Sequence, residues 1–130
     1  MSVTDINAAL AGAVDALPLA YPVAWEGRDF TPPAGPWLAM FLLSADLDGA
    51  QTVDRAGGLL QIDINHPLNA GAPKLLADAD VVARHFQPGA RFAFAGQSVR
   101  IRKRDVSGIR RDENRLTITV TISYRAVIDR

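Results

Sequence analysis

The C-terminal part of the chain contains ten consecutive residues in which apolar and polar side chains alternate without interruption. Leu116, Ile118, Val120, Ile122 and Tyr124 occupy every second position, and hydroxyl or arginine side chains stand between them. Successive side chains of a β-strand point to opposite faces, so the pattern predicts a strand with one face in a core. Such a strand needs further strands beside it and a layer that covers its apolar face.

Two segments have the helical spacing that a covering layer requires. Apolar residues recur every three or four positions over residues 6–17, and Pro18 ends the pattern. Residues 74–86 carry a second apolar stripe, which the turn residues Pro88 and Gly89 follow. Three polar residues of this segment are assigned to positions outside the stripe: Asp78, Asp80 and Arg84.

Four further segments are predicted to be strands. Residues 37–43 are continuously apolar, residues 58–66 alternate, and a short segment contains Phe92 and Phe94. The fourth strand covers residues 97–104, in which Val99 and Ile101 share one face. The opposite face of that strand is expected to carry Ser98, Arg100, Arg102 and Arg104. Short connections between consecutive strands favour antiparallel pairing.

These elements predict an α+β fold, with a mainly antiparallel sheet and two helices packed on one face. The chain has 130 residues, of which 48% are hydrophobic, and this is the size and composition of one globular domain, residues 1–130. The other face of the sheet is expected to stay in water or to meet a partner. The connections are assigned to a polar hairpin loop, a turn and a charged turn: residues 44–56, 67–73 and 107–114.

An extended arm is expected over residues 18–36, which contain five prolines. Proline fixes φ and removes a backbone donor, so this segment is neither a helix nor a central strand. The arm also holds Tyr21, Val23, Trp25 and Phe30, which are too apolar to remain in water. It must pack either on its own core or on a neighbouring subunit.

Charge is distributed unevenly, although the net charge is zero. Residues 1–90 have four basic and ten acidic side chains, whereas residues 91–130 have ten basic and four acidic ones. Copies stacked head to tail, or one face bound to an acidic partner, would use this asymmetry. Alternatively, the charges interleave on the folded surface.

The sequence offers few candidates for catalysis or metal binding. It contains no cysteine, and its two histidines, His66 and His85, lack the spacing of a zinc site. The segment 46–54 fails as a calcium loop, because its glycine stands at the fourth position rather than the sixth. We therefore expect no enzyme activity, no catalytic residue, no cofactor and no metal. A pocket lined by Asp63, His66 and His85 would favour a small-molecule-binding protein instead.

A basic cluster is the most distinctive charge feature: Arg100, Arg102, Lys103, Arg104, Arg110 and Arg111. Three interpretations stay open for it. The arginines form a solvated strand face, a subunit contact in which the planar guanidinium pairs with carboxylates, or a contact with phosphates.

No apolar run approaches the roughly 20 residues that cross a bilayer. The N-terminus also lacks the basic and apolar regions of a signal peptide. We expect a protein that stays in the cytosol of the cell that makes it.

Several segments resemble those of a known family. After the N-terminal helix comes Pro22-Val-Ala-Trp25-Glu-Gly-Arg-Asp-Phe30-Thr-Pro-Pro33-Ala-Gly35-Pro-Trp-Leu. Residues 55–64 follow, then residues 67–86 with their Leu-Ala-Asp-Ala helix, and finally residues 120–125. Together they resemble the tail-terminator proteins of long-tailed bacteriophages and prophages, over nearly the whole chain. The Ala-Trp…Phe-x-Pro-Pro segment is the most specific part of this resemblance.

The resemblance implies a structural protein of the virion tail, made in the cytoplasm of the bacterial host. It implies a homo-oligomeric ring, typically of six copies, that caps the tail tube, ends its polymerisation and presents a surface to the head-completion protein. DNA would pass nearby. The subunit-contact candidates are the arm residues and the basic cluster: Trp25, Phe30, Pro32, Pro33, Arg100, Arg102, Lys103, Arg104, Arg110 and Arg111. The alternative is another neck or tail-tube protein.

Overall fold

The computed structural model describes residues 3–44, 55–68, 71–94, 97–112 and 114–128. Its helices are α1 (Val3–Asp15) and α2 (Ala72–His85). Its strands are β1 (Val23–Ala24), β2 (Trp37–Ser44), β3 (Arg55–Pro67), β4 (Arg91–Phe94), β5 (Gln97–Val106), β6 (Arg110–Arg111) and β7 (Arg115–Ile128). Neither helix is long and apolar enough to cross a membrane within these described ranges.

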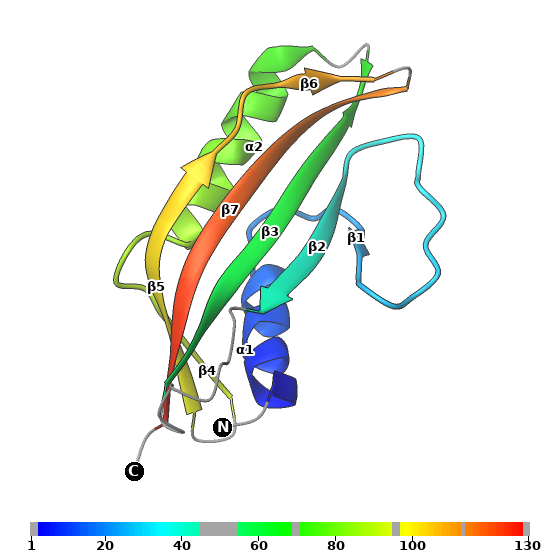
Figure 1. Cartoon of the computed structure of the whole chain (residues 1–130). Helices are drawn as coiled ribbons and strands as arrows, with labels where there is room; N and C mark the ends of the chain where they lie inside the picture. Colours follow the sequence, from blue (N-terminus) through cyan, green and yellow to red (C-terminus); the bar gives the residue numbers. More distant parts are fainter. Residues whose placement is uncertain (1–2, 45–54, 69–70, 95–96, 113, 129–130) are drawn as a thin grey trace.

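All strands form one sheet, in the order β1-β2-β3-β7-β5-β4, with β6 paired to β7. Every pairing is antiparallel except that of β1 with β2. Both helices lie on the same side of this strongly curled sheet (Figure 1). The predicted α+β fold with helices on one face is therefore confirmed, and we call the other side of the sheet the open face.

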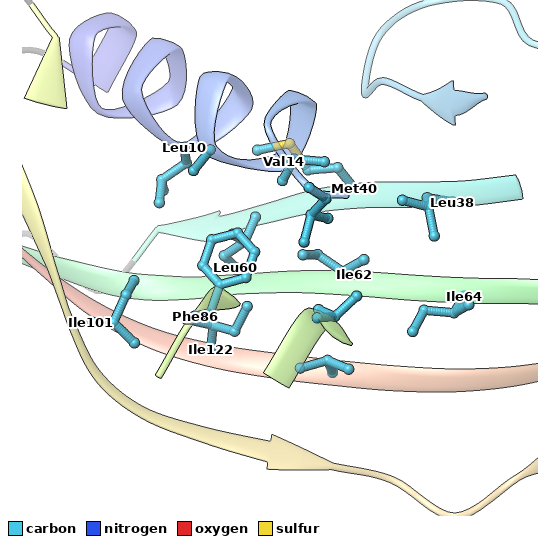
Figure 2. Packing of buried hydrophobic residues seen from close by; sticks show 14 of the residues in the cluster. Leu10, Val14, Leu38, Met40, Leu60, Ile62, Ile64, Phe86, Ile101 and Ile122 are labelled. Atoms are coloured by element: carbon cyan, nitrogen blue, oxygen red, sulfur yellow. The ribbon is translucent and has the colours of Figure 1, made fainter. Parts of the chain in front are cut away.

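The core lies between the helices and the sheet. Leu10 and Val14 of α1 meet Leu60 and Ile62 of β3 there, and Phe86 closes the C-terminal end of α2 (Figure 2). Ile118, Val120, Ile122 and Tyr124 of β7 are also buried, and Leu116 is half-buried. The alternation that predicted β7 thus correctly assigned its two faces.

β7 pairs with β3 along thirteen residue pairs, from Arg55↔Val127 to Pro67↔Arg115. Short connections predicted the pairs β2–β3 and β4–β5, but nothing in the local pattern identified the long-range pair of β3 with β7. This pairing inserts the C-terminal strand into the middle of the sheet.

Three predicted connections need correction. Ser44, Arg55 and Ala56 belong to strands rather than to the hairpin loop, and residues 45–54 lie outside the described residues. Ala72 and Pro73 open α2, because proline is accommodated in a first helical turn whose N–H groups have no partner. The charged turn contains β6, whose two residues pair with Leu116 and Thr117.

A β-bulge between Ile101 and Lys103 corrects the predicted faces of β5. Arg100 lies opposite Arg125 and faces the open side, as expected. After the extra residue the alternation is shifted, so that Arg104 lies opposite Ile122 and shares the helix-covered side. The basic residues of β5 therefore do not form one face.

Candidate subunit-contact surfaces

The first part of the arm packs on its own chain. Leu19, Tyr21, Val23 and Trp25 are half-buried against the core. The amide of Leu38 donates a hydrogen bond of 2.9 Å to the carbonyl of Pro22, which begins the parallel pairing of β1 with β2. The sequence left open whether the arm packs on its own core or on a neighbouring subunit, and this part packs on its own core.

The second part of the arm reaches away from the core (Figure 1). Phe30 is half-buried against Trp37, with ring centroids 5.0 Å apart, whereas Pro32 and Pro33 are exposed. The two prolines form one wall of a hollow of about 280 Å³, whose other side includes Trp37, His66 and Arg115. Of the four arm candidates, Pro32 and Pro33 are thus the most accessible and Trp25 and Phe30 the least.

Arg115 is held at this hollow by two neighbours. Its guanidinium lies 5.4 Å from the centroid of the Trp37 ring, and its Nε is 3.3 Å from Oδ2 of Asp112. Asp112 accepts hydrogen bonds from the backbone amides of Asn114 and Arg115, and these bonds lower the pKa of its carboxyl group. These contacts hold the Arg115 guanidinium beside the exposed Pro32 and Pro33.

The basic cluster is distributed over both sides of the sheet. By register, Arg100, Lys103 and Arg110 face the open side, whereas Arg104 and Arg111 lie opposite apolar residues of the covered side. Arg102 is the extra residue of the bulge. The residues predicted as one cluster therefore form two groups of cations, one on the open face and one on the covered face of the sheet.

Polar side chains are tied together on the open face. Oγ1 of Thr119 donates to Oδ1 of Asp63 at 2.7 Å and accepts a hydrogen bond of 2.6 Å from Nη2 of Arg110. Oγ1 of Thr117 donates to Oδ1 of Asn65 at 2.8 Å. Arg110 is thus partly engaged within its own chain.

Large apolar side chains are exposed in several places. Phe41 and Leu59 lie on the open face, and each is 38% exposed. Val106 is 47% and Ile109 is 39% exposed between the basic residues of β5 and β6. Exposed apolar residues that stand singly are normal on a protein surface, so these side chains are accessible to a partner but do not by themselves identify a contact.

A charged cluster that the sequence did not predict lies around the buried Asp78 of α2. Asp78 is 1% exposed, and its Oδ2 accepts hydrogen bonds from His66 Nε2 at 2.6 Å and from the Tyr21 hydroxyl at 2.8 Å. Nζ of Lys74 lies 3.3 Å from Oδ1 of the same carboxylate. Burial, and then the bond to Asp78, raises the pKa of Tyr21, and Asp78 likewise raises the pKa of Lys74.

The assignment of Asp78 to a position outside the apolar stripe was wrong. Asp78 stands three residues after Leu75 and four before Val82, and all three are buried on α2. This spacing places the carboxylate on the apolar stripe, and the same spacing could have predicted from the sequence that Asp78 is buried. The assignment overlooked this spacing, because aspartate is rarely buried without partners.

The residues of the rival small-molecule pocket do not converge. Asp63 lies on the open face, whereas His66 is buried on the covered side. Nε2 of His85 donates to the carbonyl of Ala13 at 2.8 Å, and its ring packs on Phe86 and Phe92. Within the described ranges, no group of three or more potential metal ligands is present.

The fold and these surfaces define a class: an α+β subunit with one covered and one open sheet face. A family model of phage tail terminator proteins matches residues 5–124. The chain therefore belongs to the phage tail terminator family, and it is a structural component of the phage tail that contacts other tail or head proteins. The family is structural rather than enzymatic.

Two other comparisons give less. A solved structure, whose name states no function, superposes with a TM-score of 0.80 over all of this chain and 99% of the other. The two sequences are 24% identical, so this likeness supports the fold alone. No curated protein matches the chain.

Proposed function

We propose that the chain, as a single domain over residues 1–130, forms a ring of six copies that caps the tail tube. The ring ends tube polymerisation and provides the surface to which the head-completion protein binds. The observation that carries this proposal is the family match over residues 5–124. The partners are further copies of this chain, the tube protein and the head-completion protein. Assembly takes place in the cytoplasm of the bacterial host, before DNA passes through the finished tail.

The open face supports a role in assembly. One side of the sheet is covered by two helices, while the other side exposes Phe41 and Leu59. A heterologous contact uses two different patches of each copy and closes into a ring when the rotation between copies permits. The accessible candidates for these patches lie in two places. One is the second part of the arm, with Pro32 and Pro33, and the other is the segment 97–111, which we call the basic hairpin.

Deletion of the gene tests the proposed function directly. Tube polymerisation without a terminator should continue, so that electron micrographs show tubes of uncontrolled length, and a plasmid copy should restore the normal length. Loss of all tubes would instead identify a tube subunit, and tails of normal length that fail to join heads would identify a neck protein. Either result would contradict termination.

The basic hairpin is tested by Arg102→Glu, which reverses one exposed charge at the bulge. We expect weaker length control, because a like-charge contact replaces a favourable one at the subunit boundary. Arg84→Glu on the exposed side of α2 is the matched control and should leave tail length unchanged. Equal effects of the two variants would remove the hairpin from the interface.

A further inference from the structure

Three arginines form a row across three neighbouring strands on the open face. Arg91 of β4 pairs in register with Arg100 of β5, and Arg100 pairs in register with Arg125 of β7. Directly opposed residues of antiparallel strands share a face, and their Cβ atoms are about 5 Å apart. We call these three residues the arginine row. Arg91 and Arg100 are exposed and Arg125 is half-buried.

This arrangement is unfavourable in an isolated chain, because like charges directly opposite on neighbouring strands repel. The ion pairs between described residues involve Asp63, Asp78 and Asp112, and none of them reaches the arginine row. A bound group with several negative charges would remove the repulsion. The row is therefore a surface suited to an acidic partner.

The opposite end of the sheet carries exposed carboxylates. β1 is the terminal strand there, and after Trp25 come residues 26–29 with Glu26, Arg28 and Asp29, all exposed. We call residues 26–29 the acidic segment, since its net charge is −1. The arginine row belongs to the three strands at and near the other end, β4, β5 and β7.

A hollow beside the acidic segment has the chemistry to receive a guanidinium group. It has a volume of about 230 Å³, and its lining includes Trp25, Glu26 and Asn7, together with Arg28. A guanidinium stacks on an aromatic ring and pairs with a carboxylate, which Trp25 and Glu26 provide. Oε1 of Glu26 also accepts a hydrogen bond from the amide of Leu42, which fixes the carboxylate at the edge of β2.

We propose that the arginine row of one copy binds the acidic segment of the next copy, with an arginine entering the hollow beside Trp25. This inference rests on the proposed ring and identifies the contact that closes it. The two patches lie towards opposite ends of one sheet, as a head-to-tail contact requires. A second copy is favoured over nucleic acid, because the chain has zero net charge and residues 1–90 hold ten of its fourteen acidic groups.

The test exchanges the charges of the two patches. Arg91→Glu/Arg125→Glu changes the row from +3 to −1 and leaves Arg100 between two opposite charges, which favours the fold. Glu26→Gln/Asp29→Lys changes the acidic segment from −1 to +2 and keeps an acceptor for the Leu42 amide. The four substitutions combined in one chain restore complementarity between copies.

Each variant replaces the deleted gene, and tail lengths are measured in electron micrographs. Either pair alone should reduce the proportion of normal tails about tenfold or more, and the combined chain should largely restore it. The control Arg91→Lys/Arg125→Lys preserves the charge of the row and leaves the Arg100 guanidinium in place, so it should retain length control. Thermal unfolding of each purified variant checks that the fold is intact.

Two outcomes would overturn the contact. If the row variant alone keeps normal tail length, the row is not at the interface. If the combined chain fails like the row variant, the row binds something else: nucleic acid, another tail protein, or the aspartates of residues 45–54 in the same chain, which lie outside the described residues. Both outcomes leave termination itself intact when the deletion still gives long tubes. Normal tails after deletion would instead refute the proposed function.

Discussion

The two faces of the sheet are built from the same strands, yet they hold their polar groups in different ways. On the covered face, Asp78 and His66 are buried and hydrogen-bonded to each other, and the half-buried Tyr21 donates a second bond to the carboxylate. On the open face, Thr119 is hydrogen-bonded to Asp63 and to Arg110, and water can compete for the bond of Arg110, whose side chain is 59% exposed. We therefore expect the loss of a buried partner to destabilise the fold more than the loss of an exposed one, because a buried polar group cannot bond to water instead.

The largest expected effect is that of Asp78→Ala. Removing the carboxylate leaves the buried His66 donor without its acceptor and removes the partner of the half-buried Tyr21 hydroxyl, and we expect a loss of about 3–5 kcal/mol in the free energy of unfolding. Urea denaturation measures this change. Asp80→Ala, on the exposed side of the same helix, should cost less than about 0.5 kcal/mol. Equal midpoints for the two variants would refute the importance of the buried cluster.

Leu59 and Leu60 provide the most direct comparison of the two faces, because they are neighbours on β3. Leu60 is 0% and Leu59 is 38% exposed. Leu60→Ala should lower the free energy of unfolding by about 2–5 kcal/mol by leaving a cavity. Leu59→Ala should cost about 1 kcal/mol or less and should instead affect assembly. A similar cost at both positions would mean that the open face is buried within the single chain.

Tyr21→Phe removes one hydroxyl from the buried cluster and should cost about 1 kcal/mol at neutral pH. Burial and Asp78 raise the pKa of Tyr21 above its ordinary value of 10.0. The folded state therefore holds this proton more tightly than the unfolded state, and the resulting stability is lost as pH rises from 10.0 through the folded pKa.

Unfolding at several alkaline pH values checks this sign. The phenylalanine variant should lose less stability than the wild type above pH 10.0. Some loss should remain, since burial also raises the pKa of Tyr124. A steeper alkaline loss in the variant would contradict the location of Tyr21 in the cluster.

The smallest expected effect is a gain in stability from Arg100→Glu. The substitution places a carboxylate directly between Arg91 and Arg125, and we expect an increase of about 0.2–1 kcal/mol in the free energy of unfolding. Thermal unfolding at low salt measures the gain, which high salt should reduce. Lys103 lies opposite Ser123, so Lys103→Glu is the matched control and should give a smaller gain in the free energy of unfolding. A loss of stability at Arg100 would show that the row is already neutralised within the chain.

The sequence by itself determined the two helices and the strands β2, β3, β4, β5 and β7, and it determined which face of β3 and of β7 is buried. The alternation of β7 and the stripes of α1 and α2 suffice for this, because the periodicity of an element is contained within its own residues. The prolines likewise determined that the arm is extended, although they did not determine which part of it packs on the core.

Only the tertiary structure decided the features that depend on two segments at once. The pairing of β3 with β7, the bulge that turns Arg104 to the covered side, and the opposition of Arg91, Arg100 and Arg125 are all properties of register. Asp78 is buried because His66 and Tyr21 supply its donors from elsewhere in the chain. No local pattern contains the partner, and for this reason the arginine row and the buried cluster emerged only when the strands and helices were assembled.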